Sequence, residues 1–158
     1  MKNDDEWMKK ALICAERAYS QGEVPVGAVI VLEDQLIGEG WNQPILSHDA
    51  TAHAEIMALR SASLKMENYR LAGATMYVTI EPCAMCFGAM THARVKRLVY
   101  GTSEPKSGAI HSNLQLHQAK CFNHQIEITS GILSEVCTNL IQQFFKARRV
   151  AKKRHDSV

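Results

Sequence analysis

Two short segments, His53-Ala54-Glu55 and Glu81-Pro82-Cys83-Ala84-Met85-Cys86, carry the pattern around which the rest of the chain is arranged. Cys83 and Cys86 are three residues apart, so at the start of a helix both thiolates lie on one face and can bind the same tetrahedral metal ion. His53 supplies a third donor, which leaves the fourth position of a zinc ion open to water. The pattern therefore predicts a catalytic zinc site and not a closed structural one.

Two further residues fit this prediction. Pro82 suits the first helical position, because proline lacks the backbone donor that a helix leaves unpaired there. Helical side chains lean toward the N-terminus, so His53 and Glu55 can both face a metal ion lying off the first turn. Zinc lowers the pKa of bound water to about 7. We predict that Glu55 carries the proton of that water as a general acid and base, a role worth about 10²–10⁴-fold in rate.

Each half of the pattern also has a simpler interpretation. A single histidine is more often a surface or core residue than a ligand, and a Cys-x-x-Cys pair also occurs in redox sites and structural zinc sites. A structural zinc site would need a fourth ligand, for which the sequence offers His92, Cys121 or His124. The order of the two segments, with proline directly before the first cysteine, favours the catalytic site.

Length and composition predict one soluble domain. The chain has 158 residues, of which 46% are hydrophobic, and we expect a single domain over residues 1–158 with its own core. Residues 1–6 are acidic and lack the apolar run of a signal peptide, and no stretch reaches membrane-spanning length. The five cysteines, an odd number, favour reduced thiols. We therefore expect a cytoplasmic protein that does not contact a membrane.

The net charge of +2 conceals a basic C-terminal segment. Residues 146–158 hold six basic residues and one acid, so they carry +5, which leaves −3 on the other 145 residues. This asymmetry suggests a polyanionic partner, although basic residues are also common at the C-terminal end of a helix. Phe144 and Phe145 directly precede the basic run and could stack on bases. Because Leu140 and Phe144 would share one helical face, we expect at least one of the two aromatic residues to be core.

Hydrophobic periodicity predicts helices that alternate with five short strands. The first two strands flank a turn at residues 33–35 and form a hairpin, whereas helices connect the later strands and allow parallel pairing. We therefore expect a three-layer α/β/α domain with a mixed five-stranded sheet. The expected helices are 4–20 with Asp4 or Asp5 as cap, 53–63, 83–93 and about 134–153 with Ser134 as cap, and the expected strands are 26–32, 36–41, 74–80, 97–101 and 125–130, with loops at 42–52 and 102–124.

Six stretches carry a resemblance to a known family: EVPVGA at 23–28, GEGWN at 38–42, TAHAEIMA at 51–58, YVTIEPCAMC at 77–86, NH at 123–124 and FFKARR at 144–149. Through them the chain resembles the bacterial tRNA-specific adenosine deaminases of the cytidine-deaminase superfamily, from the first helix to about Ala151. His-x-Glu followed by Pro-Cys-x-x-Cys is the signature of zinc-dependent nucleobase deaminases. The resemblance implies the cytidine-deaminase-like fold and a homodimer.

The resemblance also implies an activity, namely hydrolysis of the wobble adenosine in a tRNA anticodon to inosine with release of ammonia. One zinc ion per subunit, bound by His53, Cys83 and Cys86, would activate the attacking water, and Glu55 would protonate the ring nitrogen and then the departing amine. It further implies that Asn42 and the Ala54 backbone hold the flipped nucleoside, against an apolar wall that includes Val26. The implied RNA contacts are Glu104, Lys106, Phe145, Lys146, Arg148 and Arg149.

Two residues depart from the family pattern. Glu104 stands where an aspartate is usual, which keeps the charge on a longer arm, and Phe87 stands where a small residue is common.

Two other functions remain compatible with the motif. A deaminase of a free base or nucleoside, such as guanine, cytosine or cytidine, uses the same zinc apparatus, although guanine deaminases commonly carry proline where this chain has Ala84-Met85. A zinc-stabilised RNA-binding module would need neither Glu55 nor an open coordination position.

Overall fold

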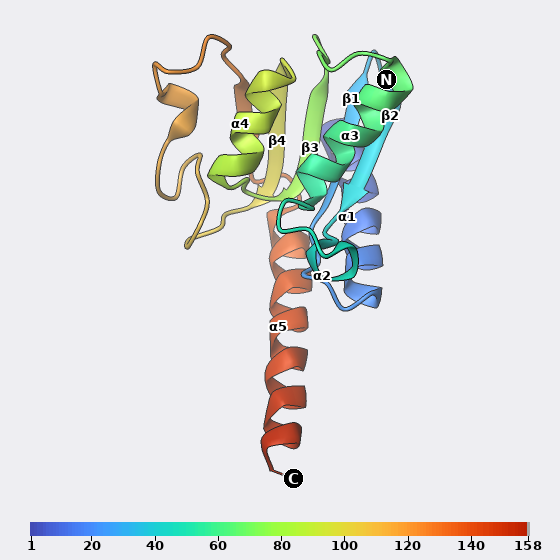
Figure 1. Ribbon diagram of the computed structural model, residues 1–158, viewed down its shortest axis with the longest axis vertical. Coiled ribbons are helices and arrows are strands. Elements are labelled where there is room, and N and C mark those ends of the chain that lie inside the picture. Colours follow the sequence, from blue (N-terminus) through green and yellow to red (C-terminus); the bar gives the residue numbers. More distant parts are fainter. Residues whose placement is uncertain (158) are drawn as a thin grey trace.

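The computed structural model describes residues 1–157 and contains one five-stranded sheet with helices on both faces (Figure 1). Helices α3 and α4 cover one face, whereas α1 and α5 pack on the other. The predicted three-layer α/β/α architecture with a mixed sheet is therefore confirmed. The strands are β1 Gly27–Leu32, β2 Gln35–Trp41, β3 Thr75–Ile80, β4 Arg97–Thr102 and β5 Glu127–Ser130, and the helices are α1 Asp4–Ser20, α2 Pro44–Ser47, α3 Ala54–Met66, α4 Ala84–His92 and α5 Ser134–Asp156, with a 3-10 turn η1 at Leu116–Gln118.

Strand direction brings several loops to one edge of the sheet. The strand order is β2-β1-β3-β4-β5, in which β1 pairs antiparallel with both β2 and β3, and the other two pairs are parallel. Strands β2, β3 and β4 consequently run in the same direction. The segments that follow them begin at Asn42, Glu81 and Ser103, and all three leave the sheet at this edge. Ligand sites in α/β sheets commonly form at such an edge.

Close packing between α3 and β2 positions the first turn of α3. A Cβ atom on Gly40 would lie 2.4 Å from both the Ala54 carbonyl oxygen and the Ala58 backbone nitrogen. Only glycine leaves room for the helix backbone to approach this closely. Ala54 and Ala58 are themselves fully buried, so small residues on both sides bring α3 directly onto the strand.

An ion-pair network ties α1 to the sheet on the opposite face. Arg97 donates two hydrogen bonds to the Asp4 carboxylate, at 2.7 and 2.9 Å, and the Tyr77 hydroxyl donates a third at 2.9 Å. The Arg97 guanidinium lowers the pKa of the Asp4 carboxyl, although partial burial opposes the shift. The network joins the start of α1 to β3 and β4.

Helix α5 extends well beyond the sheet (Figure 1). Only Cys137 and Phe144 are buried along it, and every residue from Phe145 to Asp156 is exposed. Phe144 is therefore core, as one of the two aromatic residues was predicted to be, and Phe145 is exposed. Among the described residues, no helix combines the length and the hydropathy needed to cross a bilayer.

Two predicted helix caps are wrong. The side chain of Asn3, and neither Asp4 nor Asp5, caps α1, because Asn3 and Glu6 exchange backbone and side-chain hydrogen bonds at 2.9 Å in a capping box.

The predicted cap of α5 is the second one that is wrong. Ser134 is its first helical residue and not its cap, since the chain enters from Leu133 in a left-handed conformation, φ 52°, without a side-chain hydrogen bond.

Other boundaries differ by a few residues. Pro82 precedes the N-cap of α4, which is Cys83, and does not occupy the first helical position. Helix α3 continues to Met66 and α5 to Asp156, and both end three residues later than predicted. The predicted loop at 42–52 contains the short helix α2, because the buried Glu23 carboxylate accepts two of its N–H groups at 2.9 and 3.2 Å.

Candidate metal centre and substrate pocket

The three predicted ligands converge from the starts of two helices. His53 is the N-cap of α3, Cys83 is the N-cap of α4, and Cys86 lies in the first turn of α4. The His53 Nδ1 atom lies 3.6 Å from the sulfur of each cysteine, and all three donor atoms are within 4.8 Å of one another. A tetrahedral zinc ion with ordinary Zn–N and Zn–S bonds separates such donors by about 3.6 Å. The donor set and its spacing therefore fit zinc.

A fourth protein ligand is absent from this cluster in the part of the chain that the structure describes. His92, Cys121 and His124, the candidates for completing a structural site, are not members of it. His124 Nε2 instead lies 2.7 Å from the Val95 carbonyl oxygen. The arrangement supports an open coordination position and disfavours the structural alternative.

The electrostatics of the cluster favour a metal-binding thiolate. A hydrogen bond from the Cys86 thiol lowers the pKa of Cys83 to about 4, and a hydrogen bond from His53 adds to the shift, although burial opposes it. In turn, the hydrogen bond with Cys83 raises the pKa of His53. The same hydrogen bond and burial raise the pKa of Cys86, so without a metal ion the thiolate form, which is the form that binds metal, is favoured at Cys83.

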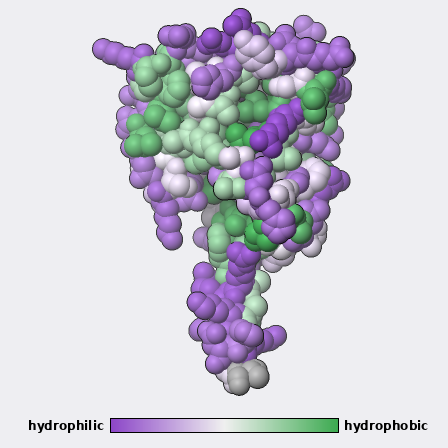
Figure 2. All heavy atoms as spheres, in the orientation of Figure 1, coloured by the Kyte–Doolittle hydropathy of each residue, from purple (hydrophilic) through white to green (hydrophobic). Residues whose placement is uncertain are grey.

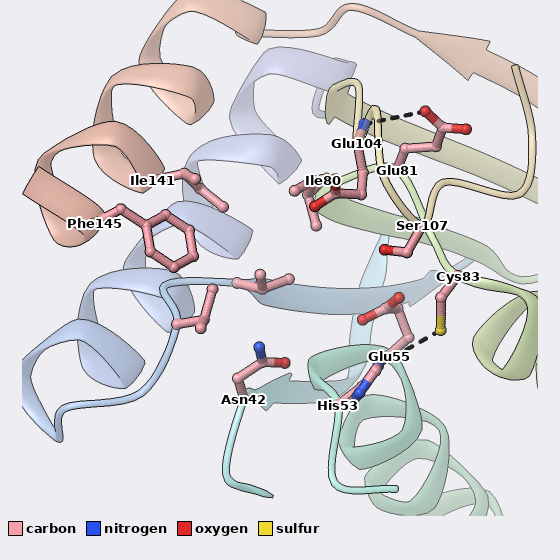
Figure 3. A pocket seen from close by; sticks show the side chains of 12 residues that line it. Asn42, His53, Glu55, Ile80, Glu81, Cys83, Glu104, Ser107, Ile141 and Phe145 are labelled. Atoms are coloured by element: carbon pink, nitrogen blue, oxygen red, sulfur yellow. Dashed lines mark hydrogen bonds between the residues drawn. The ribbon is translucent and has the colours of Figure 1, made fainter. Parts of the chain in front are cut away.

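Glu55 lies beside the cluster but is not part of it. Its side chain comes from the first turn of α3, is 3% exposed and lines the same cavity as His53 and Cys83 (Figure 3). Burial raises the pKa of the Glu55 carboxyl above its ordinary value. A raised pKa favours the protonated form, so the carboxyl group can donate as well as accept a proton, which suits the predicted general acid and base.

The cavity at this edge of the sheet holds about 160 Å³. A closed cavity of about 150 Å³ admits a benzene ring, so the hollow suits one flat heterocycle. Figure 3 shows side chains from α5 on the side opposite the residues of the α3 turn. The lining residues are Val24, Val26, Asn42, His53, Glu55, Ile80, Glu81, Cys83, Glu104, Ser107, Ile141 and Phe145.

The predicted substrate residues are close together, and two of them bond to each other. Val26 and Asn42 line the cavity, whereas Ala54 is fully buried beneath it. The Ala54 N–H donates to the Asn42 side-chain oxygen at 2.8 Å. The Ala54 donor is thus already paired, and Asn42 keeps its amide N–H₂ group for a ligand.

The predicted RNA contacts divide into two groups. Glu104 and Phe145 line the cavity, and Lys106 lines an adjoining hollow of about 540 Å³ that shares both of those residues. Lys146 and Arg149 instead lie on the exposed part of α5.

Arg148 also belongs to the exposed part of α5, but its side chain contacts the body of the domain. Its guanidinium lies 4.8 Å from the Phe144 ring centre and donates to the Gly22 carbonyl oxygen at 3.2 Å.

Five lining residues were not predicted from the sequence: Val24, Ile80, Glu81, Ser107 and Ile141. Glu81 had a local signal, because it directly precedes Pro82 and Cys83, yet a buried role does not follow from that position alone. Burial would raise the pKa of the Glu81 carboxyl, but hydrogen bonds from Ser112 and from backbone N–H groups outweigh it and lower the pKa. Ile141 lines the cavity because of the way α5 packs against the sheet, and the local sequence does not reveal how a helix packs.

Comparisons with known proteins agree with this geometry. Residues 2–149 match the family model of the MafB19-like deaminases. The chain is 49% identical over 151 residues to a tRNA-specific adenosine deaminase of Haemophilus influenzae, covering 95% of this chain and 87% of that protein. It is 40% identical to a tRNA-specific adenosine deaminase of Bacillus subtilis, covering 97% and 95% of the two chains.

A solved structure shows the same fold. It comes from work on A-to-I editing by tRNA:A34 deaminases at the wobble position of transfer RNA. The TM-score is 0.84 at 38% identity, and the match covers 85% of this chain and 98% of that one.

Removal of a ligand tests the metal centre. We expect the purified protein to bind one zinc ion per chain and the variants His53→Ala and Cys86→Ala to retain substoichiometric zinc after dialysis, because two donors cannot replace three. Metal content is measured by mass spectrometry, and circular dichroism reports whether the helices persist. Cys121→Ala is the matched control and should keep its zinc. Loss of zinc from this variant would instead support a structural site in which Cys121 is a ligand.

Proposed function

The chain belongs to the family of tRNA-specific adenosine deaminases, and we therefore propose that it hydrolyses the wobble adenosine of a tRNA anticodon to inosine and releases ammonia. The observation that carries the proposal is the buried Glu55 carboxyl group beside the His53, Cys83 and Cys86 donors. A cytoplasmic location is in keeping with such a substrate.

The residues of the pocket can each take a part in this reaction. A zinc ion bound by the three donors would lower the pKa of a water molecule to about 7 and so provide the nucleophile at neutral pH. Glu55 would accept a proton from that water and deliver it to the ring nitrogen, and a second transfer would release the amine as ammonia. The net change exchanges the purine C–N bond to the amino group for a C–O bond. Asn42 would hold the base edge through its amide N–H₂ group, with Val26 against the base face.

The shape of the site favours a base within a chain over a free base. The cavity beside Glu55 adjoins the larger hollow, since both are lined by Ile80, Glu104, Ile141 and Phe145. A free base would use only the inner cavity, whereas neighbouring nucleotides of an RNA loop can occupy the outer one. Phe145 is 40% exposed at this junction and presents an aromatic surface, on which stacking contributes about 1–3 kcal/mol per base.

The exposed end of α5 provides the charge for a nucleic-acid partner. Figure 2 shows it as a hydrophilic column that extends away from the body of the domain. The basic residues on this column are Lys146, Arg148, Arg149, Lys152, Lys153 and Arg154. Arg148 is held against Phe144 and Gly22, whereas the other five basic side chains are exposed along the described part of α5 and can approach phosphate groups.

We also propose a homodimer, with α3 and α4 at the interface. A hollow of about 390 Å³ between these helices is lined largely by apolar atoms of Ile56, Leu59, Tyr69 and Ala89. Figure 2 shows hydrophobic surface on this face of the molecule. Tyr69 is 65% exposed here, and large aromatic residues of this kind are enriched among the residues that dominate interfaces.

Replacement of Glu55 tests the chemistry. Glu55→Gln keeps the shape of the side chain but removes the proton carrier, so ammonia release from tRNA should fall by about 10²–10⁴-fold. Zinc content and RNA binding should stay at the wild-type level. Ammonia is measured with a coupled enzyme assay and inosine by nucleoside mass spectrometry, with free adenosine, cytidine, guanine and cytosine as competing substrates. Glu39→Gln, on an exposed carboxylate of β2, is the control.

A variant that lacks two positive charges tests the basic end of α5. Lys152→Gln/Lys153→Gln should reduce the slope of log binding constant against log salt by up to about 1.4, since each neutralised phosphate on a single strand contributes about 0.7. The pair Lys9→Gln/Lys10→Gln on α1 removes the same charge elsewhere and should leave the slope unchanged. Equal slopes for the two variants would exclude a phosphate contact by the column.

An interface variant tests the dimer. Tyr69→Glu places a charge in the apolar hollow and should weaken self-association by about 2 kcal/mol or more, the cost of a lost interface hot spot. Light scattering across a dilution series measures the association. Ile13→Glu adds the same charge at an exposed apolar residue of α1, on the opposite face of the sheet, and should remain dimeric. A wild-type protein with the mass of one chain at all concentrations would contradict the proposal.

A further inference from the structure

The carboxylate of Glu81 is the centre of a cluster of hydrogen bonds outside the metal ligands. The residue is 2% exposed and lies two positions before Cys83. One carboxylate oxygen accepts the Glu104 N–H at 3.1 Å and the Ser112 hydroxyl. The other accepts the N–H groups of Ile110 and His111 at 3.0 Å and of Ser112 at 3.1 Å. Five donors from one loop therefore converge on a single side chain.

This loop, residues 104–112, contains no regular secondary structure that would hold it by itself. Two further contacts tie it to the same turn. The Ala109 N–H donates to the Pro82 carbonyl oxygen at 2.9 Å. A Cβ atom on Gly108 would lie 2.5 Å from the Glu81 carboxylate oxygen, so the loop backbone reaches this close only because residue 108 is glycine.

The loop contributes residues to the substrate pocket. Glu104 and Ser107 lie on it and line the cavity together with Cys83. Figure 3 shows the hydrogen bond between the Glu104 backbone and the Glu81 carboxylate, with Ser107 of the same loop near Cys83. No basic side chain pairs with Glu81 among the ion pairs of the described residues, so N–H and O–H donors alone compensate its charge.

We propose that Glu81 is a positioning residue, which fixes the 104–112 loop to the metal-binding turn and thereby sets the position of the Glu104 and Ser107 side chains that meet the substrate. The inference concerns the substrate side of the pocket and rests on the proposed function for the identity of that substrate. Neutral glutamine cannot replace Glu81, because its amide N–H₂ group would face two donors in the place of the first carboxylate oxygen or three in the place of the second. Buried backbone N–H groups would then lose their acceptor, which the native structure otherwise avoids.

Amide hydrogen exchange tests the proposal without reference to catalysis. In the wild-type protein the N–H groups of Glu104, Ile110, His111 and Ser112 should be protected. In Glu81→Gln their exchange should accelerate by about 10- to 100-fold, the effect of losing a hydrogen bond to a charged acceptor. Gly108→Ala should accelerate the same amides, because the added methyl group displaces the carboxylate. The control Glu16→Gln, on an exposed residue of α1, should leave them unchanged.

Two further measurements distinguish positioning from a role in the metal centre or in folding. Glu81→Gln should retain zinc at the wild-type ratio and raise KM for tRNA about tenfold or more, with a much smaller change in kcat. Glu81→Asp keeps the charge and should restore part of the protection. Amide exchange at the wild-type rate in both Glu81→Gln and Gly108→Ala, or loss of zinc from Glu81→Gln, would overturn the proposal. If the wild-type protein releases no ammonia from tRNA, the proposed function fails, while amide exchange still decides the role of Glu81.

Discussion

The site depends on the direct contact between α3 and β2, where glycine on the strand meets alanine on the helix. Because Gly40 allows the backbone of α3 to touch the strand, the helix start has one position relative to the sheet edge. His53 and Glu55 lie in that first turn, so their positions follow from backbone packing and not from flexible side chains. The second half of the site, at the start of α4, follows β3, which runs in the same direction as β2. Two helix starts at one edge therefore face each other across the gap that a metal ion would fill.

Three buried glutamates, of which Glu55 and Glu81 line the cavity, have different surroundings. Glu23 accepts backbone N–H groups of α2, and Glu81 accepts five donors around the 104–112 loop. Glu55 instead faces the cavity. Burial raises the pKa of Glu55, whereas hydrogen bonds lower the pKa of Glu81. When the surroundings of two carboxyl groups shift their pKa values in opposite directions, one group commonly transfers protons and the other stays charged. Glu23 and Glu81 therefore hold α2 and the 104–112 loop in place, and Glu55 remains as the carboxyl group that we propose for the chemistry.

The residues that could be predicted from the sequence are those whose function depends on local spacing. His53, Cys83 and Cys86 are predictable because a metal ion requires specific donor types at fixed separations, and Glu55 because it lies next to a ligand. The hairpin and the parallel crossovers likewise follow from the lengths of the connections. Ile80 and Ile141 could not be identified in this way, since any apolar residue on β3 or α5 fits the same pattern and only the packing of the helix against the sheet decides which one faces the cavity.

The helix caps and the role of Glu81 escaped prediction for a related reason. Several acidic and hydroxyl residues near each helix start could serve as cap, and small differences in backbone geometry select among them. A buried glutamate, in turn, is recognisable only when its donors are known, and those of Glu81 come from residues 23 to 31 positions further along the chain.

The residues that we propose for the chemistry and those that we propose to face the substrate lie on different kinds of structure. The metal donors and Glu55 are fixed on the first turns of α3 and α4, whose geometry is set by the sheet. Glu104 and Ser107 come from a loop without regular secondary structure, and Phe145 comes from the terminal helix. This separation allows one catalytic apparatus to serve different substrates. Glu81 joins the two parts, since it precedes the metal-binding turn in the sequence and accepts hydrogen bonds from the loop that faces the substrate. We therefore expect a change in the loop to alter which substrate enters, provided that the donors to this carboxylate remain in place.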